Sequence, residues 1–148
     1  RSKMARDNVQ NVEPIQSTIT QTKLNPNSVD AALIVDAYHE FSHPLEMATS
    51  ILESLKPGGK LVICDAGKAN KLHGLFGRLW MATFVQWTAR IITKDPDHPW
   101  KWLAKTYTHY GTHRYYKSMM REIGYQNVRA RLLLPFGMAS RFIATKPE

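Results

Sequence analysis

A strand–helix–strand pattern near the middle of the chain is the feature that most constrains the fold. The run SVDAALIVD at 28–36 is almost unbroken by polar residues, as in strands that are covered on both faces. Apolar residues then recur at helical spacing over 45–55, after Pro44, which is tolerated in a first helical turn. The segment Pro57-Gly58-Gly59 turns the chain into a second apolar strand at 61–64. The pattern predicts a βαβ unit with two parallel strands and a right-handed crossover.

Further helices and a terminal hairpin are predicted around this unit, within a single α/β domain that spans residues 1–148. Helical periodicity, capping residues and alternating apolar residues mark their positions. The predicted elements are, in chain order, a short strand at 12–17 weakened by Pro14, a helix at 75–92, a helix at 100–110, a helix at 112–123 between Thr112 and Gly124, and strands at 128–134 and 139–145.

The net charge of +8 is concentrated in the second half of the chain. Residues 1–65 hold six basic and eight acidic side chains, whereas residues 66–147 hold fourteen basic and three acidic ones. A strongly basic segment of this kind is typical of proteins that contact nucleic acid, an anionic membrane surface or an anionic substrate. It is also typical of solvated helix faces. No nucleic-acid-binding motif accompanies the basic segment, so we expect no nucleic-acid partner. Peripheral contact with an anionic membrane stays among the expected partners. The single cysteine, Cys64, excludes an intramolecular disulfide and favours a cytoplasmic protein.

The segment His39-Glu40-Phe41-Ser42-His43 matches the HExxH pattern of zinc proteases. That mechanism needs both histidines on one face of a helix, with the glutamate as general base. Pro44 biases His43 away from helical geometry, and His39 follows a predicted strand almost directly. A strand-to-helix loop is therefore favoured, zinc hydrolysis is a remote alternative, and no metal ligand is assigned.

The order of the predicted elements resembles the second half of a class I S-adenosylmethionine-dependent methyltransferase. It is closest in character to the methyltransferases of ubiquinone and menaquinone biosynthesis. The resemblance implies a partial Rossmann-like sheet, with parallel core strands, a C-terminal antiparallel hairpin, and a helical insert or lid at 68–111. The segments that carry it are SVDAALIVDAYHEFSHP at 28–44, ILESLKPGGKLVICD at 51–65 and MMREIGYQNV at 119–128.

The glycine-rich cofactor loop of the resembled family has no counterpart in this sequence. Gly58-Gly59 is no substitute, because it precedes a strand instead of opening a helix. The resemblance therefore implies a domain that lacks its N-terminal part, with residues 12–17 and 29–36 about 14 Å apart as strands. The open edge of the strand at 29–36 would expose unpaired backbone groups. We expect upstream residues, a partner chain or a second copy of this chain to pair with that edge.

Four residues correspond to positions that hold the cofactor in the resembled family. Asp36 and Ala37 follow the central strand, at the edge where open α/β sheets bind ligands. Thr18 and Ile19 match the segment that contacts adenine, although Thr18 stands where the family commonly has aspartate. The resemblance thus implies that S-adenosylmethionine is the cofactor.

Two neighbouring residues are candidates for the chemistry itself. Tyr38 would place an aromatic face or a hydroxyl group near the sulfonium, where a cation over a ring is favourable. His39 would act as a base for a hydroxyl-bearing substrate, and a loop histidine bonded to backbone is the alternative interpretation.

Large aromatic side chains in the predicted insert suit a pocket for an apolar acceptor, although core packing is favoured for at least half of them. The resemblance therefore implies methyl transfer to a small lipid-like or quinone-like molecule, by a displacement that depends on alignment more than on acid–base groups. The alternative from another class is a non-catalytic fragment or subunit that serves as a binding module. The aromatic residues are Phe76, Trp80, Phe84, Trp87, Trp100 and Trp102.

Overall fold

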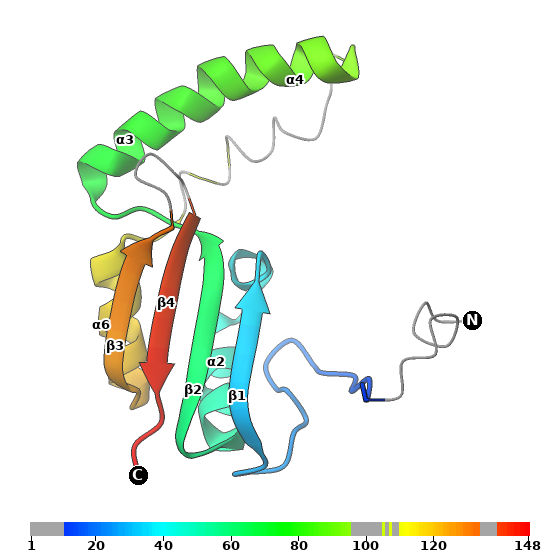
Figure 1. The fold of residues 1–148 in the computed structure, drawn as a ribbon, viewed down its shortest axis with the longest axis vertical. Coiled ribbons are helices and arrows are strands. Elements are labelled where there is room, and N and C mark those ends of the chain that lie inside the picture. Colours follow the sequence, from blue (N-terminus) through cyan, green and yellow to red (C-terminus); the bar gives the residue numbers. More distant parts are fainter. Residues whose placement is uncertain (1–10, 96–104, 106, 108–109, 134–138) are drawn as a thin grey trace.

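The computed structural model describes residues 11–95, 105, 107, 110–133 and 139–148, and contains one four-stranded sheet. The strands lie in the order β1-β2-β4-β3 (Figure 1). β1 and β2 are parallel, whereas β4 pairs antiparallel with both β2 and β3, so the predicted βαβ unit and terminal hairpin are confirmed. The strands are β1 (Val29–Val35), β2 (Leu55–Ala66), β3 (Gln126–Leu132) and β4 (Ala139–Thr145).

Two helices, α2 (Pro44–Ser54) and α6 (His113–Ile123), cover one face of the sheet (Figure 1). Pro44 lies in the first turn of α2, and the Thr112 hydroxyl accepts a hydrogen bond from the Tyr115 N–H at the start of α6. Gly124 ends α6 with a φ of 114°, which glycine adopts without steric cost. The predicted start and stop of this helix are therefore confirmed.

The hydrophobic core lies between these two helices and the sheet. Buried side chains of β2 and β4 on this face alternate with less buried ones, as the two-residue period of a strand requires. The Tyr125 hydroxyl donates to the Ala48 carbonyl at 2.9 Å, which ties the end of α6 to α2. The core residues include Met47, Ile51, Leu61, Ile63, Met119, Met120, Val128 and Phe142.

β1 is covered on one face only, in contrast to the prediction from its apolar run. Leu33 and Val35 are 69% and 60% exposed, while Ala32 and Ile34 pack against the core. β1 also lies at the edge of the sheet that the described residues form, as expected.

The predicted strand at 12–17 is wrong, because these residues have no regular secondary structure. Pro14 has no N–H to donate to a neighbouring strand, and all six residues are exposed. This N-terminal segment first bonds to the body of the domain at Thr22, whose N–H donates to the Ser50 hydroxyl of α2 at 3.1 Å.

The Pro57-Gly58-Gly59 turn lies inside β2, where the pairing register with β1 shifts. Gly58 has a φ of 73°, and its N–H donates to the Lys146 carbonyl at 3.2 Å. A Cβ on Gly59 would lie 2.7 Å from the Lys56 carbonyl oxygen, so the turn needs glycine there. The turn is thereby fixed to the end of the chain that follows β4.

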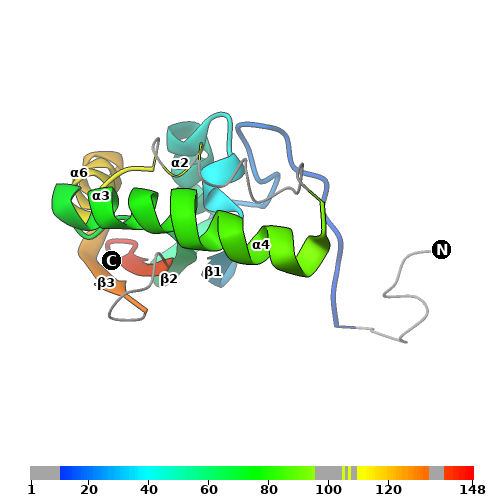
Figure 2. The same ribbon diagram turned by 90° about the horizontal axis from the view of Figure 1, so that it is seen from above.

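A continuous helical arm, Lys71–Thr93, crosses the end of the sheet at which β1 and β2 terminate (Figures 1 and 2). It consists of α3 (Lys71–Trp80), a π-helical turn η2 (Met81–Val85) and α4 (Gln86–Thr93). Asn70 caps it by accepting a hydrogen bond from the His73 N–H at 2.8 Å. The predicted helix at 75–92 is therefore confirmed and is longer than expected. Across the described ranges, no helix combines the length and apolarity needed to cross a bilayer.

The core-packing interpretation of the aromatic residues in the arm is wrong. Phe76, Trp80, Phe84 and Trp87 are between 45% and 64% exposed. They are exposed because small residues, Gly74 and Gly77 among them, occupy the buried side of the arm. Trp100 and Trp102, with most of the helix predicted at 100–110, lie outside the described residues.

Candidate functional site

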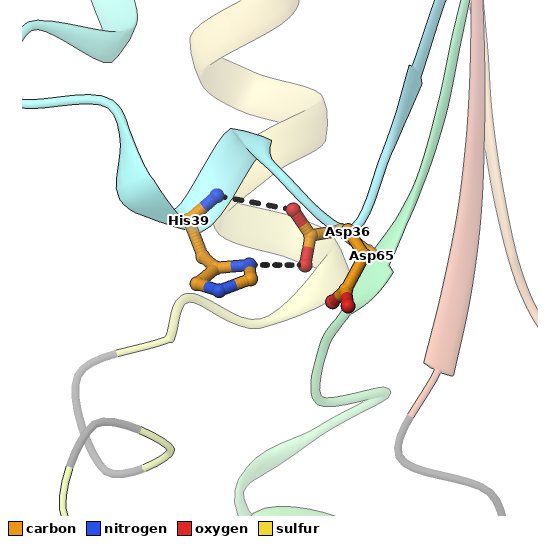
Figure 3. A group of neighbouring side chains, drawn as sticks. All are labelled: Asp36, His39 and Asp65. Atoms are coloured by element: carbon orange, nitrogen blue, oxygen red, sulfur yellow. Dashed lines mark hydrogen bonds and ion pairs between the residues drawn. The ribbon is translucent and has the colours of Figure 1, made fainter. Parts of the chain in front are cut away.

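Three polar side chains meet where β1 and β2 end (Figure 3). Asp36 directly follows β1, and its N–H donates to the Cys64 carbonyl of β2 at 2.8 Å. Its φ of 51° is left-handed, and this turns the chain out of the sheet into the short 3-10 helix η1 (Tyr38–Glu40). That turn brings His39 beside Asp65, which lies near the end of β2.

His39 and Asp65 form a tight pair. His39 Nδ1 lies 2.6 Å from Asp65 Oδ1, and the His39 N–H donates to Oδ2 at 3.0 Å. The Ala66 N–H also donates to Oδ1, so both oxygens of the buried Asp65 carboxylate have hydrogen-bond partners. An ionised carboxylate only accepts, so in the neutral imidazole Nδ1 carries the ring proton and Nε2 keeps a lone pair. Glu40 Oε1 lies 4.0 Å from Nε2, beyond hydrogen-bond distance.

An open cavity of about 500 Å³ adjoins the His39 ring. Its wall is mostly aromatic, and the Tyr110 ring lies 5.3 Å from the imidazole, centroid to centroid. An apolar space with few polar groups is typical of sites for small organic ligands. The lining residues are Tyr38, His39, Phe41, Pro44, Tyr110, Gly111, Tyr115, Tyr116 and Met119.

Tyr38 is a buried member of the core as well as part of this wall. It is 5% exposed, and its hydroxyl donates to the Pro44 carbonyl at 3.2 Å. Burial raises the pKa of the Tyr38 hydroxyl, with a smaller effect from the nearby Tyr116 and Tyr115. The hydroxyl is thus engaged in packing the loop, and a contact between its ring and a sulfonium stays a prediction.

The four predicted cofactor residues lie on two segments. Asp36 is exposed and Ala37 is half-buried, and both adjoin the His39–Asp65 pair. Thr18 Oγ1 accepts from the Gln21 N–H at 2.9 Å and so forms a local turn. That turn leaves Ile19 65% exposed.

One grouping of ligand atoms has metal-like spacing. Asp36, His39 and Asp65 each offer one atom, and these atoms lie within 4.8 Å of one another. Both oxygens of Asp65 already accept hydrogen bonds. The three residues are therefore best described as the hydrogen-bonded His39–Asp65 pair with the Asp36 carboxylate nearby. His43 precedes the first turn of α2 and lies 3.5 Å from Glu46, so the two histidines of HExxH do not share a helical face. The zinc-hydrolase alternative is not favoured.

Asp65 and Tyr110 belong to this candidate site, although no role was predicted for either from the sequence. A signal for Asp65 was present, because it ends the second strand as Asp36 ends the first, and carboxyl ends of parallel strands share one edge. Tyr110 lies outside any recognisable motif, and only the folded chain brings it to His39.

Sequence comparisons identify relatives along most of the chain. A family model described as the ubiE/COQ5 methyltransferase family matches residues 1–146. The ubiquinone/menaquinone biosynthesis C-methyltransferase UbiE of Pseudomonas putida (strain GB-1) is 29% identical over 119 residues, which cover 80% of this chain and 46% of the relative. Its namesake from Pseudomonas syringae pv. syringae (strain B728a) is 27% identical over the same coverage. The chain spans about half the length of the curated relatives it matches.

Solved structures share the fold at low sequence identity. A SAM-dependent methyltransferase from Aquifex aeolicus has a TM-score of 0.60 and 17% identity, covering 97% of this chain and 60% of that one. Phosphoethanolamine N-methyltransferase 2 of Haemonchus contortus, solved with S-adenosyl-L-methionine, has a TM-score of 0.59 and 12% identity, covering 88% and 36%. The predicted α/β fold, a Rossmann-like sheet with a C-terminal hairpin, is confirmed.

Proposed function

The chain belongs to the ubiE/COQ5 methyltransferase family, and on that premise we propose that it transfers a methyl group from S-adenosylmethionine to a small apolar acceptor. The His39–Asp65 pair carries the proposal, because it lies at the ligand-binding edge of two parallel strands and beside an aromatic cavity. The binding-module alternative is not favoured, since the matched family consists of methyltransferases.

Four residues are proposed to hold the cofactor. The exposed carboxylate of Asp36 can accept hydrogen bonds from hydroxyl or ammonium groups, and the half-buried Ala37 follows it directly. Thr18 shapes the turn that presents Ile19, whose exposed side chain suits the flat face of an adenine ring. These hydrogen-bond-accepting and apolar groups fit S-adenosylmethionine. When bound, that molecule supplies an electrophilic methyl group and keeps the electron pair of the broken C–S bond on sulfur.

The acceptor is proposed to be a quinone-like or lipid-like ring that bears a hydroxyl group. The names of the relatives point to the biosynthesis of such molecules. The cavity fits this class, because Phe41, Tyr110 and Tyr115 offer ring surfaces against which another aromatic ring can stack. The predicted insert at 68–111 is proposed as a lid over this edge of the sheet, where its described helices lie (Figure 2).

His39 is proposed as the general base. Its Nε2 takes the proton of the acceptor hydroxyl, while an oxygen or ring carbon of the acceptor forms the new bond to the methyl group. Asp65 stays ionised, holds the Nδ1–H and stabilises the positive charge that the ring gains. When a ring carbon is methylated, its own hydrogen leaves as a proton afterwards and the aromatic ring is restored. Tyr38 is proposed to contribute its ring as a wall beside the reacting groups.

The proposal is tested with calorimetry and labelled cofactor. We expect saturable heat on titration with S-adenosylmethionine, and transfer of a labelled methyl group to a long-chain alkyl hydroquinone. The matched control acceptor is the corresponding dimethoxybenzene, which has no hydroxyl proton for His39 to remove and should stay unlabelled. Failure to bind the cofactor, or equal labelling of both acceptors, would contradict the proposal.

A further inference from the structure

The helical arm, Lys71–Thr93, exposes an unusual amount of apolar surface. More than half of the exposed large apolar side chains among the described residues belong to it. A contiguous apolar patch of this kind marks an interaction site more often than chance exposure. The residues are Leu72, Leu75, Phe76, Leu79, Trp80, Phe84, Trp87, Ile91 and Ile92.

The π-helical turn keeps these side chains on one side of the arm. Gly74, Gly77, Met81 and Ala89 are buried and mark the side that faces the body of the protein. Ala89 lies eight positions after Met81, whereas two turns of a regular α-helix take about 7.2 residues. In an uninterrupted α-helix the two side chains would therefore point in different directions. The wider π turn absorbs the extra residue and realigns the buried side. The apolar residues opposite it therefore form a continuous outward stripe.

The arm is basic as well as apolar. Its charged residues are Lys71, Arg78 and Arg90, and it contains no aspartate or glutamate. Lys71 and Arg78 lie two helical turns apart and, with Lys68, line an open cavity of about 260 Å³ at the side of α3. An apolar stripe with a basic flank is typical of helices that lie in the interface of an anionic bilayer.

We propose that the arm docks on the surface of an anionic phospholipid bilayer. The apolar stripe enters the boundary of the acyl chains, and Lys71 and Arg78 reach the lipid phosphates. Trp80 and Trp87 are exposed on the arm, and tryptophan favours the headgroup level. No described element lies beyond the outward side of the arm, which leaves that side open to a flat surface (Figures 1 and 2).

A second copy of the chain suits this surface less well than a bilayer does. Two arms packed face to face would bring their lysine and arginine side chains together, with no acidic residue in the arm itself to pair with them. Lipid phosphates supply the missing negative charge. The inference does not depend on methyl transfer, because docking is measured without cofactor or acceptor.

Liposome flotation tests the proposal on the intact chain. We expect flotation with vesicles of phosphatidylcholine and phosphatidylglycerol in equal amounts, and little with phosphatidylcholine alone. The double variants Leu72→Gln/Leu79→Gln and Lys71→Glu/Arg78→Glu should each weaken binding to the anionic vesicles about tenfold or more. All four side chains are exposed, so we expect the far-ultraviolet circular dichroism to be unchanged.

Matched controls carry the same chemical changes elsewhere on the surface. Leu33→Gln alters a leucine of β1 that is 69% exposed, and Arg129→Glu/Arg131→Glu reverses two exposed charges of β3. Both should bind as the unaltered protein does. The proposal is overturned if the protein does not float with anionic vesicles, or if the arm variants bind as tightly as the controls. It is also overturned if sedimentation shows a dimer that Leu72→Gln/Leu79→Gln dissociates, because a second copy would then cover the stripe.

Discussion

His39 Nδ1 lies 2.6 Å from Asp65 Oδ1, although 26 residues separate the two in the sequence. The parallel pairing of Val35 with Cys64 brings them together, because Asp65 directly follows Cys64 and His39 comes four residues after Val35. The left-handed backbone of Asp36 then directs the chain so that the imidazole returns over the end of β2. The βαβ unit thus delivers an oriented imidazole at the edge of the sheet where ligands bind.

Replacing Asp65 with asparagine should lower methyl transfer strongly. The amide cannot stabilise a positively charged imidazole, and its NH₂ group can donate to Nδ1 and reverse the ring tautomer. We expect the turnover number to fall about 100-fold or more, within the usual contribution of a positioned base. The measurement is the initial rate of label transfer to the hydroquinone, with cofactor affinity followed by calorimetry.

Glu40→Gln is the matched control for that variant. Glu40 is an exposed carboxylate whose Oε1 lies 4.0 Å from His39 Nε2, so the same chemical change occurs beside the same ring without a hydrogen bond. Turnover within about twofold of the unaltered protein is expected, because exposed charge pairs contribute little. Equal losses in both variants would show that negative charge near the ring matters and that the hydrogen bond does not.

Tyr38 should matter more for stability through its ring than through its hydroxyl. Tyr38→Phe removes the hydrogen bond to the Pro44 carbonyl and the long one to Met119 Sδ, and should cost about 1 kcal/mol of unfolding free energy. Tyr38→Ala leaves a cavity among Phe41, Tyr116 and Met119, and should cost about 3–5 kcal/mol. Urea denaturation measures both. A large loss in Tyr38→Phe would assign the stabilising role to the hydroxyl instead.

Replacing either glycine of the turn in β2 with alanine should lower stability, but by different amounts. A Cβ on Gly59 would meet the backbone oxygens of Lys56 at 2.7 Å and Asp30 at 3.1 Å, so Gly59→Ala should cost about 2 kcal/mol or more. A Cβ on Gly58 meets nothing within 4 Å, and Gly58→Ala should cost only the strain of its positive φ, about 1 kcal/mol. Thermal unfolding that ranks the two variants in the opposite order would contradict this account of the turn.

Acid should destabilise the fold partly through His113. Burial lowers the pKa of His113 below its ordinary value, with smaller effects from His73 and Lys117, and its Nε2 lies 2.7 Å from the buried Ser140 hydroxyl. The unfolded chain therefore binds the proton more readily, and stability falls as the pH drops below about 6.5, the ordinary pKa of histidine. Urea denaturation at several pH values should show a smaller decline in His113→Gln than in His43→Gln, which alters an exposed histidine.

The elements that the sequence predicted well are those whose signals are local. The apolar runs of β1 and β2, the proline at the start of α2, and Thr112 with Gly124 around α6 each fix an element through neighbouring residues. The prediction of a strand at 12–17 is wrong, because apolar residues alone do not make a strand. Pro14 lacks an N–H, the side chains of this segment are exposed, and the segment pairs with no strand among the described residues.

Residues whose role depends on distant parts of the chain were harder to predict. The aromatic residues of the arm have the spacing of a buried face, yet Gly74 and Gly77 allow the opposite side to approach the body. His39 and Asp36 could be proposed from the sequence because they follow a recognisable strand, whereas the aromatic wall that Tyr110 and Tyr116 contribute exists only in the folded chain. Strand ends could therefore be predicted, and contacts across the sheet edge could not.

The most direct test of the proposed chemistry is a comparison of cofactor binding and turnover in His39→Gln. Glutamine keeps a polar side chain at this position but removes the basic Nε2, so we expect the dissociation constant for S-adenosylmethionine to stay within about twofold while turnover falls about 100-fold or more. Turnover equal to that of the unaltered protein would contradict the role of His39 as the base.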